Sequence, residues 1–182
     1  MATKTLQIGS SLPDFNLPSI DGKYYSPASL VEKSALIIIF SCNHCPYVQA
    51  YEQRIMDIQK DYETKGVAIV AINSNDAQQY PEDSFEQMKV RANEKLFNFI
   101  YLRDEDQSIA AKFDAAHTPE IFLFDSKRKL VYHGKIDDNW QDEQKVKSKY
   151  LRNALDELLN GKEISVPETY SIGCTIKWKR QA

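Results

Sequence analysis

Two short, fully apolar runs, Ala35–Phe40 and Val67–Ile72, constrain the fold of this chain most strongly. Both are rich in β-branched residues, which is typical of strands that are buried on both faces of a sheet. The segment between them repeats its apolar residues at helical spacing, at Val48, Tyr51, Ile55, Ile58 and Tyr62. Gly66 then stands where a helix-ending glycine is expected. Strand, helix and strand predict a βαβ unit with parallel strands and a right-handed crossover.

Turn residues predict two hairpins outside this unit. Asp14–Leu17 and Lys23–Tyr25 flank Asp21-Gly22, which is a common hairpin turn. Ile121–Asp125 and Leu130–Gly134 flank a charged turn and predict an antiparallel pair. Strands of both kinds in one chain indicate a mixed sheet.

Helical spacing and turn residues predict the remaining elements. We expect a helix from Pro81 to Leu96, a strand at Phe99–Leu102, a short helix at Gln107–Phe113 and a final helix that ends at Gly161 and carries Val146, Tyr150, Ala154, Leu155 and Leu158. In the tail, Glu163–Ala182, the apolar Ile176 and Trp178 predict a packed, strand-like end. The expected fold class is α/β, with a mixed central sheet flanked by helices, in one domain over residues 1–182.

Charge and hydropathy exclude several classes of partner. The formal net charge is −3, and no basic patch of the kind found in nucleic-acid-binding proteins is present. Residues 1–14 are polar and lack the profile of a secretory signal, and the longest apolar runs are too short to cross a bilayer. We therefore expect a cytoplasmic protein with neither nucleic acid nor membrane as partner.

The motif Cys42-Asn43-His44-Cys45 lies where the first apolar strand ends and the long helix begins. A helix N-terminus stabilises a thiolate through unpaired N–H groups and the helix dipole, so the pKa of a cysteine there falls from about 8.5 to roughly 3.5–7.5. We expect Cys42, at the start of the helix, to be an exposed nucleophile. Cys45, about one turn further in, is expected to resolve a mixed disulfide. His44 is expected to add positive charge or a hydrogen bond to the Cys42 thiolate.

Two other interpretations of these cysteines stay open, half of a zinc site and a pair of inert buried thiols. Zinc sites of the finger type use four ligands, usually with a second pair of Cys or His residues. The remaining candidates are not paired at ligand spacing; they are Cys174, His44, His117 and His133. Redox chemistry is therefore favoured, and no metal or cofactor is predicted.

A second informative position is Thr118-Pro119, directly before the predicted strand Ile121–Asp125. Proline is tolerated at a strand start because its missing N–H falls outside the hydrogen-bond ladder. Only about 5–6% of X–Pro bonds are cis, but a cis bond is usually a functional feature where it occurs. The residues alone leave both isomers open.

Together these features resemble the thioredoxin superfamily, and more narrowly its redoxin branch, which is related to AhpC/TSA proteins. The resemblance covers nearly the whole chain, including the N-terminal hairpin and the segments Cys42–Val48, Asn73–Asp76, Tyr80–Asp83 and Gly173–Lys179. These segments are similar to a bacterial subgroup labelled as thioredoxin family proteins or thiol–disulfide isomerases. The resemblance implies a thioredoxin-like fold.

The resemblance also implies roles for individual residues. Cys42 would attack, Cys45 would resolve, and Pro119 would be a cis-proline that lies against the disulfide. Thr118 would then offer backbone hydrogen bonds to an extended substrate.

Three departures from the family pattern limit these expectations. Leu36 stands where thioredoxins carry a buried Asp, and Ser41 replaces the Trp that usually precedes the first cysteine. Ala35 and Ile39 stand where peroxiredoxins carry a Pro and a Thr or Ser. A dedicated peroxidase is therefore disfavoured.

The sequence thus predicts a thiol–disulfide oxidoreductase that exchanges its dithiol or disulfide with protein or small-molecule thiols. One alternative is a copper- or zinc-binding module of the Sco type, with Cys42, Cys45 and a histidine as ligands. A weaker alternative is a thiol-dependent, antioxidant peroxidase. Cys174 is either a buried core thiol or a third redox thiol, and His117 either faces the pair or lies on the surface. The direction of electron flow and the oligomeric state stay open.

Overall fold

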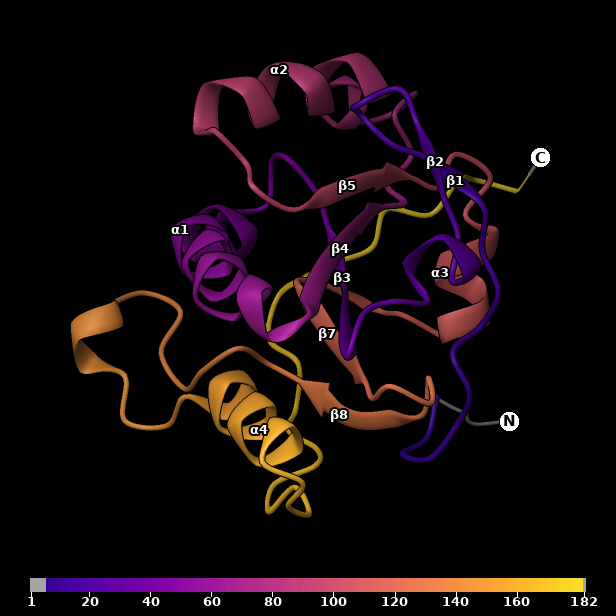
Figure 1. The fold of residues 1–182 in the computed structure, drawn as a ribbon. Helices are drawn as coiled ribbons and strands as arrows, with labels where there is room; N and C mark the ends of the chain where they lie inside the picture. Colours follow the sequence, from indigo (N-terminus) through magenta and orange to yellow (C-terminus); the bar gives the residue numbers. More distant parts are fainter. Residues whose placement is uncertain (1–5, 182) are drawn as a thin grey trace.

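The computed structural model of the protein describes residues 6–181, so residues 1–5 of the polar N-terminal segment and Ala182 lie outside it. A five-stranded sheet in the order β5-β4-β3-β7-β8 forms its centre (Figure 1). The strands are β3 (Ala35–Ser41), β4 (Val67–Asn73), β5 (Ile100–Arg103), β7 (Glu120–Phe124) and β8 (Leu130–Gly134). Strands β3, β4 and β5 are parallel, whereas β7 and β8 are antiparallel to their neighbours. The predicted βαβ unit and mixed sheet are confirmed.

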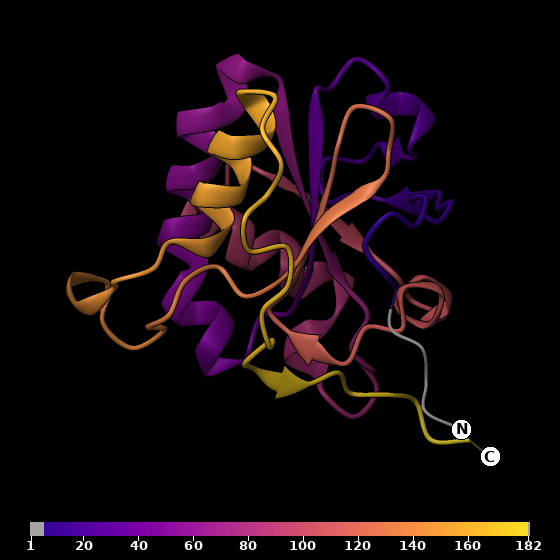
Figure 2. The same cartoon turned by 90° about the horizontal axis from the view of Figure 1, so that it is seen from below.

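Helices cover both faces of this sheet. They are α1 (Pro46–Tyr62), α2 (Phe85–Lys95), α3 (Ser108–Phe113) and α4 (Tyr150–Leu159). Helices α1 and α4 pack on one face, and α3 packs on the other together with the N-terminal segment around Phe15 (Figure 2). Helix α2 packs near the β5 edge, where Met88 contacts Ala71 and Tyr101. No helix among the described residues has the length and apolar character needed to span a membrane.

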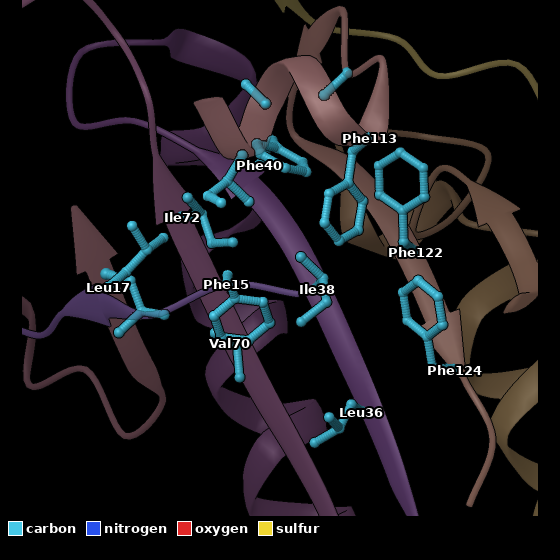
Figure 3. Packing of buried hydrophobic residues seen from close by; sticks show 14 of the residues in the cluster. Phe15, Leu17, Leu36, Ile38, Phe40, Val70, Ile72, Phe113, Phe122 and Phe124 are labelled. Carbon is cyan, nitrogen blue, oxygen red and sulfur yellow. The ribbon is translucent and has the colours of Figure 1, made fainter. Parts of the chain in front are cut away.

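Strand β3 is apolar at every position because both of its faces are covered. Leu36, Ile38 and Phe40 point into the cluster on the α3 side, where Phe40 packs against rings that include Phe113 and Phe122 (Figure 3). The intervening residues point toward α1 and α4; they are Ala35, Ile37 and Ile39. This burial on both faces fixes the end of β3, and therefore the position of the residues that follow it.

The boundaries of several elements differ from the prediction. The N-terminal hairpin is shorter and pairs β1 (Leu17–Pro18) with β2 (Tyr24–Tyr25). Pro81 opens only a 3₁₀ turn, Pro81–Asp83, and α2 begins after Ser84, whose hydroxyl accepts the Gln87 N–H. Serine is a strong N-cap, so the helix starts there rather than at the proline.

The last helix also begins later than predicted. Val146 ends a separate 3₁₀ turn, Glu143–Lys145, and adopts an extended conformation, so it lies outside α4. The apolar periodicity from Tyr150 onward is the part that packs on the sheet, with Leu151, Ala154 and Leu155 buried.

The tail returns to the end of the sheet where α1 begins. Strand β9 (Cys174–Thr175) pairs antiparallel with β6 (His117–Thr118), which confirms the predicted strand-like end. Ile176 is buried as predicted, but Trp178 is 45% exposed, so the prediction that it packs is wrong. Figure 2 shows this yellow strand near the start of α1. At Gly173 a Cβ atom would lie 2.1 Å from the Thr118 carbonyl oxygen, so only glycine allows this close approach. The tail is therefore part of the packed structure.

Candidate active site

The Cys42–Cys45 motif occupies the connection between β3 and α1. The helix begins at Pro46, a favoured first position for proline, and Cys45 is its extended N-cap residue. Cys42 directly follows Ser41, the last residue of β3, and lies before the helix. The prediction that Cys42 starts the helix and Cys45 lies a turn inside is therefore wrong, because the helix begins only after the second cysteine.

Cys42 and Cys45 are both buried. Cys42 is 2% exposed and Cys45 is fully buried, so the prediction of an exposed Cys42 is wrong. Cys45 and Cys42 pack with Val48, and half-buried Cys174 from the tail lies against them. The sequence did not indicate this cover because Cys174 is brought there by strand pairing over a long separation.

The Thr118–Pro119 peptide bond is cis, as the resemblance implies. The Cys45 thiol donates to the Thr118 carbonyl oxygen at 3.3 Å, and the Thr118 hydroxyl lies 3.5 Å from Cys42 Sγ. Thr118 thus contacts both cysteines. Its backbone is paired with Cys174 of the protein's own tail, so the edge predicted to receive a substrate is occupied.

The surroundings shift the pKa values of Cys42 and Cys45 in opposite directions. The hydrogen bond from the Cys42 thiol lowers the pKa of Cys45, and donors from Cys174 and the Val48 N–H add to this against the opposing effect of burial. Conversely, the hydrogen bond to Cys45, burial and the Asp83 charge raise the pKa of Cys42. The pKa of Cys45, the residue that caps the helix, is therefore the lowered one of the pair, which is the reverse of the predicted order.

Cys174 completes a group of three neighbouring thiols. Burial, together with its hydrogen bond to Cys45, raises the pKa of Cys174 to about 11. Among the three cysteines it is the one that is partly exposed. Of the two interpretations of Cys174, the structure excludes the fully buried core thiol.

Asp83 is a site residue that the sequence reasoning missed. This fully buried carboxylate accepts the Asn43 backbone N–H at 2.6 Å and the Asn75 side-chain amide at 2.9 Å, and it lies 2.5 Å from His44 Nδ1. The signal was topological: polar residues that follow β3 and β4 meet at one edge because parallel strands end there together. Asp83 enters from the 3₁₀ turn after β4.

His44 has a different partner from the expected one. Its ring pairs with Asp83 and stacks on Tyr80, with 5.3 Å between the ring centroids. Cys42 Sγ, a His44 ring nitrogen and an Asp83 oxygen lie within 4.8 Å of one another, so these three residues could hold a metal ion. The effect of His44 on Cys42 is therefore tied to the Asp83 carboxylate.

The other two histidines have different surroundings from His44. His117 is in β6, where its backbone N–H donates to Glu120 at 3.0 Å, and it lines a cavity of about 500 Å³ with His133. His133 Nε2 lies 2.8 Å from Glu120 Oε1. Neither His117 nor His133 belongs to the cluster that Cys42 forms with His44.

Replacing Asp83 by Asn is expected to destabilise the protein. The amide would turn an N–H₂ group toward donors that now point at a carboxylate, and each buried unpaired donor costs about 1–3 kcal/mol. We expect the free energy of unfolding in urea to fall by about 3 kcal/mol.

Asp57→Asn is the matched control, because Asp57 accepts only an exposed hydrogen bond from Gln53 on α1. This variant should change the free energy of unfolding by no more than about 0.5 kcal/mol. Equal effects of the two substitutions would contradict the role assigned to Asp83.

The sequence matches the redoxin family over residues 7–150. No curated protein matches the chain. Among solved structures, a hypothetical protein from Sinorhizobium meliloti is 37% identical, with 98% of each chain covered and a TM-score of 0.92. An uncharacterized conserved protein from Geobacillus kaustophilus is 42% identical, with 98% of this chain and 96% of that chain covered and the same TM-score of 0.92.

More distant structures agree in fold. The thioredoxin domain of a thiol-disulfide oxidoreductase from Bacteroides vulgatus is 17% identical, with a TM-score of 0.61 over 71% of this chain and 89% of that chain. At this identity the similarity concerns the fold alone, which is thioredoxin-like. The family match covers most of the chain, and the central sheet, the cis-proline and the cysteine motif agree with it. The protein therefore belongs to the redoxin family.

Proposed function

We propose that the protein is a thiol–disulfide oxidoreductase whose working groups are Cys42 and Cys45. The observation that carries this proposal is the packing of Cys42 against Cys45 and the contact of both with Thr118 on the cis bond. The thioredoxin fold of distant relatives, one of them described as a thiol-disulfide oxidoreductase, supports thiols and disulfides as the substrate class. Its partners are protein or small-molecule thiols and disulfides.

The proposed mechanism begins with a proton transfer inside the pair. Once Cys45 has lost its proton, its thiolate takes the proton of Cys42, which packs beside it, as Cys42 attacks a substrate disulfide. A mixed disulfide between Cys42 and one half of the substrate forms, and the other half leaves as a thiolate. Cys45 returns its proton to that thiolate and attacks Cys42 Sγ, which releases the second half and leaves a Cys42–Cys45 disulfide.

Burial places a condition on this chemistry. Thiol–disulfide exchange depends on access to the attacked sulfur, and Cys42 is only 2% exposed. Exchange with a partner therefore requires displacement of the covering tail or a third sulfur nearer the surface. Displacement of the two-residue strand β9 would disrupt the fewest residues.

Equilibration in glutathione redox buffers tests the proposed function. We expect Cys42 and Cys45 to be linked in the oxidised protein and free in the reduced one, with a two-electron dependence on the glutathione ratio. Alkylation in acid followed by peptide mass mapping identifies the linked residues. A wild-type protein that keeps both thiols free at every ratio would contradict the proposal.

Metal binding is a second candidate, favoured by the proximity of Cys42, His44 and Asp83. This set differs from the predicted one of Cys42, Cys45 and a histidine, because Asp83 takes the place of Cys45. Thiolate, imidazole and carboxylate are all ligands of zinc. Metal analysis of protein purified without chelator separates the candidates: stoichiometric zinc or copper lost in Asp83→Asn supports metal binding, and metal-free protein supports the redox function alone.

A further inference from the structure

The C-terminal tail holds Cys174 beside the cysteine pair by strand pairing. Thr118 and Cys174 are directly opposite each other in the β6–β9 pair, and the Ile176 N–H donates to the Ala116 carbonyl oxygen at 2.9 Å. Gly173 allows the backbones to approach closely, since a Cβ atom there would lie 2.1 Å from the Thr118 carbonyl oxygen. Cys174 is therefore positioned by the backbone on both of its sides.

The tail is also anchored beyond β9. The Lys177 carbonyl oxygen accepts the Asp76 N–H at 2.8 Å, and the Lys177 N–H donates to Asn75 Oδ1 at 2.9 Å. The Gln107 side chain bridges the Lys177 carbonyl and the Lys179 N–H, both at 2.9 Å. These contacts keep the tail over the end of the sheet, with Cys174 against the cysteine pair.

The contacts of the sulfur atoms distinguish Cys174 from a bystander. Cys174 packs against the cluster of Cys42 and Cys45, and Cys45 Sγ contacts the backbone of Thr118, the residue directly opposite Cys174. Cys174 lowers the pKa of Cys45, whereas the largest effect on the pKa of Cys42 comes from Cys45, so Cys45 lies between the other two cysteines. Cys42 instead contacts Cys45 and Thr118 and lies close to Asp83. The sulfur atoms thus form a row, in the order Cys42, Cys45, Cys174.

Exposure is greatest at the Cys174 end of this row. Cys42 and Cys45 are buried, whereas Cys174 is half-buried on a strand at the surface of the molecule. Thr175, the other residue of β9, is exposed. An external thiol therefore meets Cys174 before it meets either member of the pair.

We propose that Cys174 is a third redox thiol, which exchanges with Cys45 and connects the buried pair to external thiols. This proposal rests on the proposed function of Cys42 and Cys45 and extends it. In the exchange step, Cys174 Sγ attacks Cys45 Sγ of the Cys42–Cys45 disulfide. The Cys45–Cys174 bond forms, the Cys42–Cys45 bond breaks, and the proton of Cys174 passes to the departing Cys42 thiolate, with no change in the number of electrons.

An external dithiol then completes the reduction. One of its thiolates attacks the accessible Cys174 Sγ, and Cys45 leaves as a thiolate that the Val48 N–H stabilises at the helix N-terminus. The second thiol of the reductant then attacks the reductant's own sulfur in this mixed disulfide. Cys174 is released, and the reductant leaves as an internal disulfide. Reduction in this order leaves Cys42 and Cys174 as thiols and Cys45 as a thiolate, and it does not require an external group to reach buried Cys42.

The Cys42→Ser variant tests the position of Cys174. It is oxidised with oxidised glutathione, alkylated in acid and mapped by mass spectrometry. We expect an intramolecular Cys45–Cys174 disulfide. A variant that stays reduced, carries only glutathione adducts or forms only intermolecular disulfides would overturn the inference. Cys42→Ala is treated identically, so that a folding defect of the serine variant, checked by circular dichroism, does not decide the result.

Two further variants make the test specific. In Cys45→Ser we expect no Cys42–Cys174 bond, because Cys45 lies between them; the appearance of that bond would overturn the proposed order. Cys174→Ser keeps Cys42 and Cys45 and therefore reports on the proposed function. If it forms no Cys42–Cys45 disulfide, the proposed function fails. If it forms this disulfide while Cys42→Ser and Cys42→Ala form none, only the role of Cys174 fails.

A rate measurement tests the connection to external thiols. The Cys42–Cys45 disulfide is prepared in the wild type and in Cys174→Ser, and its reduction by excess dithiothreitol is followed by quenched alkylation. We expect reduction to be slower in Cys174→Ser by about tenfold or more, because the accessible sulfur is missing. Equal rates in the two proteins would overturn the role of Cys174 as the point of contact.

Discussion

Cys45→Ser is expected to abolish both the internal disulfide and disulfide exchange. Cys45 contacts both other cysteines, so its removal leaves Cys42 and Cys174 without a neighbouring sulfur. Removing one member of a group that acts as a unit costs a rate factor on the order of a thousandfold or more. Reduction of a disulfide-bonded peptide by dithiothreitol, with and without the protein, measures this loss.

The control for this variant is Asp57→Asn, which alters an exposed side chain on the same helix. It should keep both the internal disulfide and the exchange rate of the wild type. Circular dichroism should show that both variants are folded. Exchange at the wild-type rate in Cys45→Ser would contradict the central role of this residue.

Gly173→Ala is expected to detach β9 and uncover Cys42. The new Cβ atom would lie 2.1 Å from the Thr118 carbonyl oxygen and 2.7 Å from its carbon, and these are backbone atoms that cannot rotate away. Overpacking costs typically 1–3 kcal/mol, and about 3 kcal/mol corresponds to a change of roughly a hundredfold in the closed-to-open ratio. Alkylation of Cys42 by iodoacetamide should accelerate by about this factor.

Gly22→Ala provides the matched control. Gly22 has a φ of +84° in the turn between β1 and β2, and nothing lies within 4 Å of its added Cβ atom. This variant should lose about 1 kcal/mol of stability through backbone strain, with no change in the alkylation rate of Cys42. Similar acceleration in both variants would indicate general loosening rather than release of the tail.

Local patterns predicted most of the fold. Apolar runs and helical spacing identified β3, α1 and β4 to within a residue or two, because these elements are buried on faces that their periodicity reveals. The predicted starts of two helices were less accurate. Ser84 moves the start of α2, and the start of α4 at Tyr150 follows the residues that reach the sheet.

The sequence predicted which residues form the site but not their surroundings. The sequence indicated the Cys42–Cys45 motif, and the family resemblance implied the cis Thr118–Pro119 bond that the structure contains. It did not predict that both cysteines are buried or that Asp83 lies beside His44. These facts depend on contacts between residues about 40 or more positions apart in the chain, which a local pattern does not encode.

The sequence by itself determined the sheet, its main helices and the two cysteines between β3 and α1, because periodicity and spacing are local properties of the chain. Only the tertiary structure decided the environment of those cysteines. The pairing of β6 with β9 brings Cys174 to Cys45, and the 3₁₀ turn after β4 brings Asp83 close to Cys42. The physical reason is that the pKa and the accessibility of a thiol depend on the groups that surround it in space.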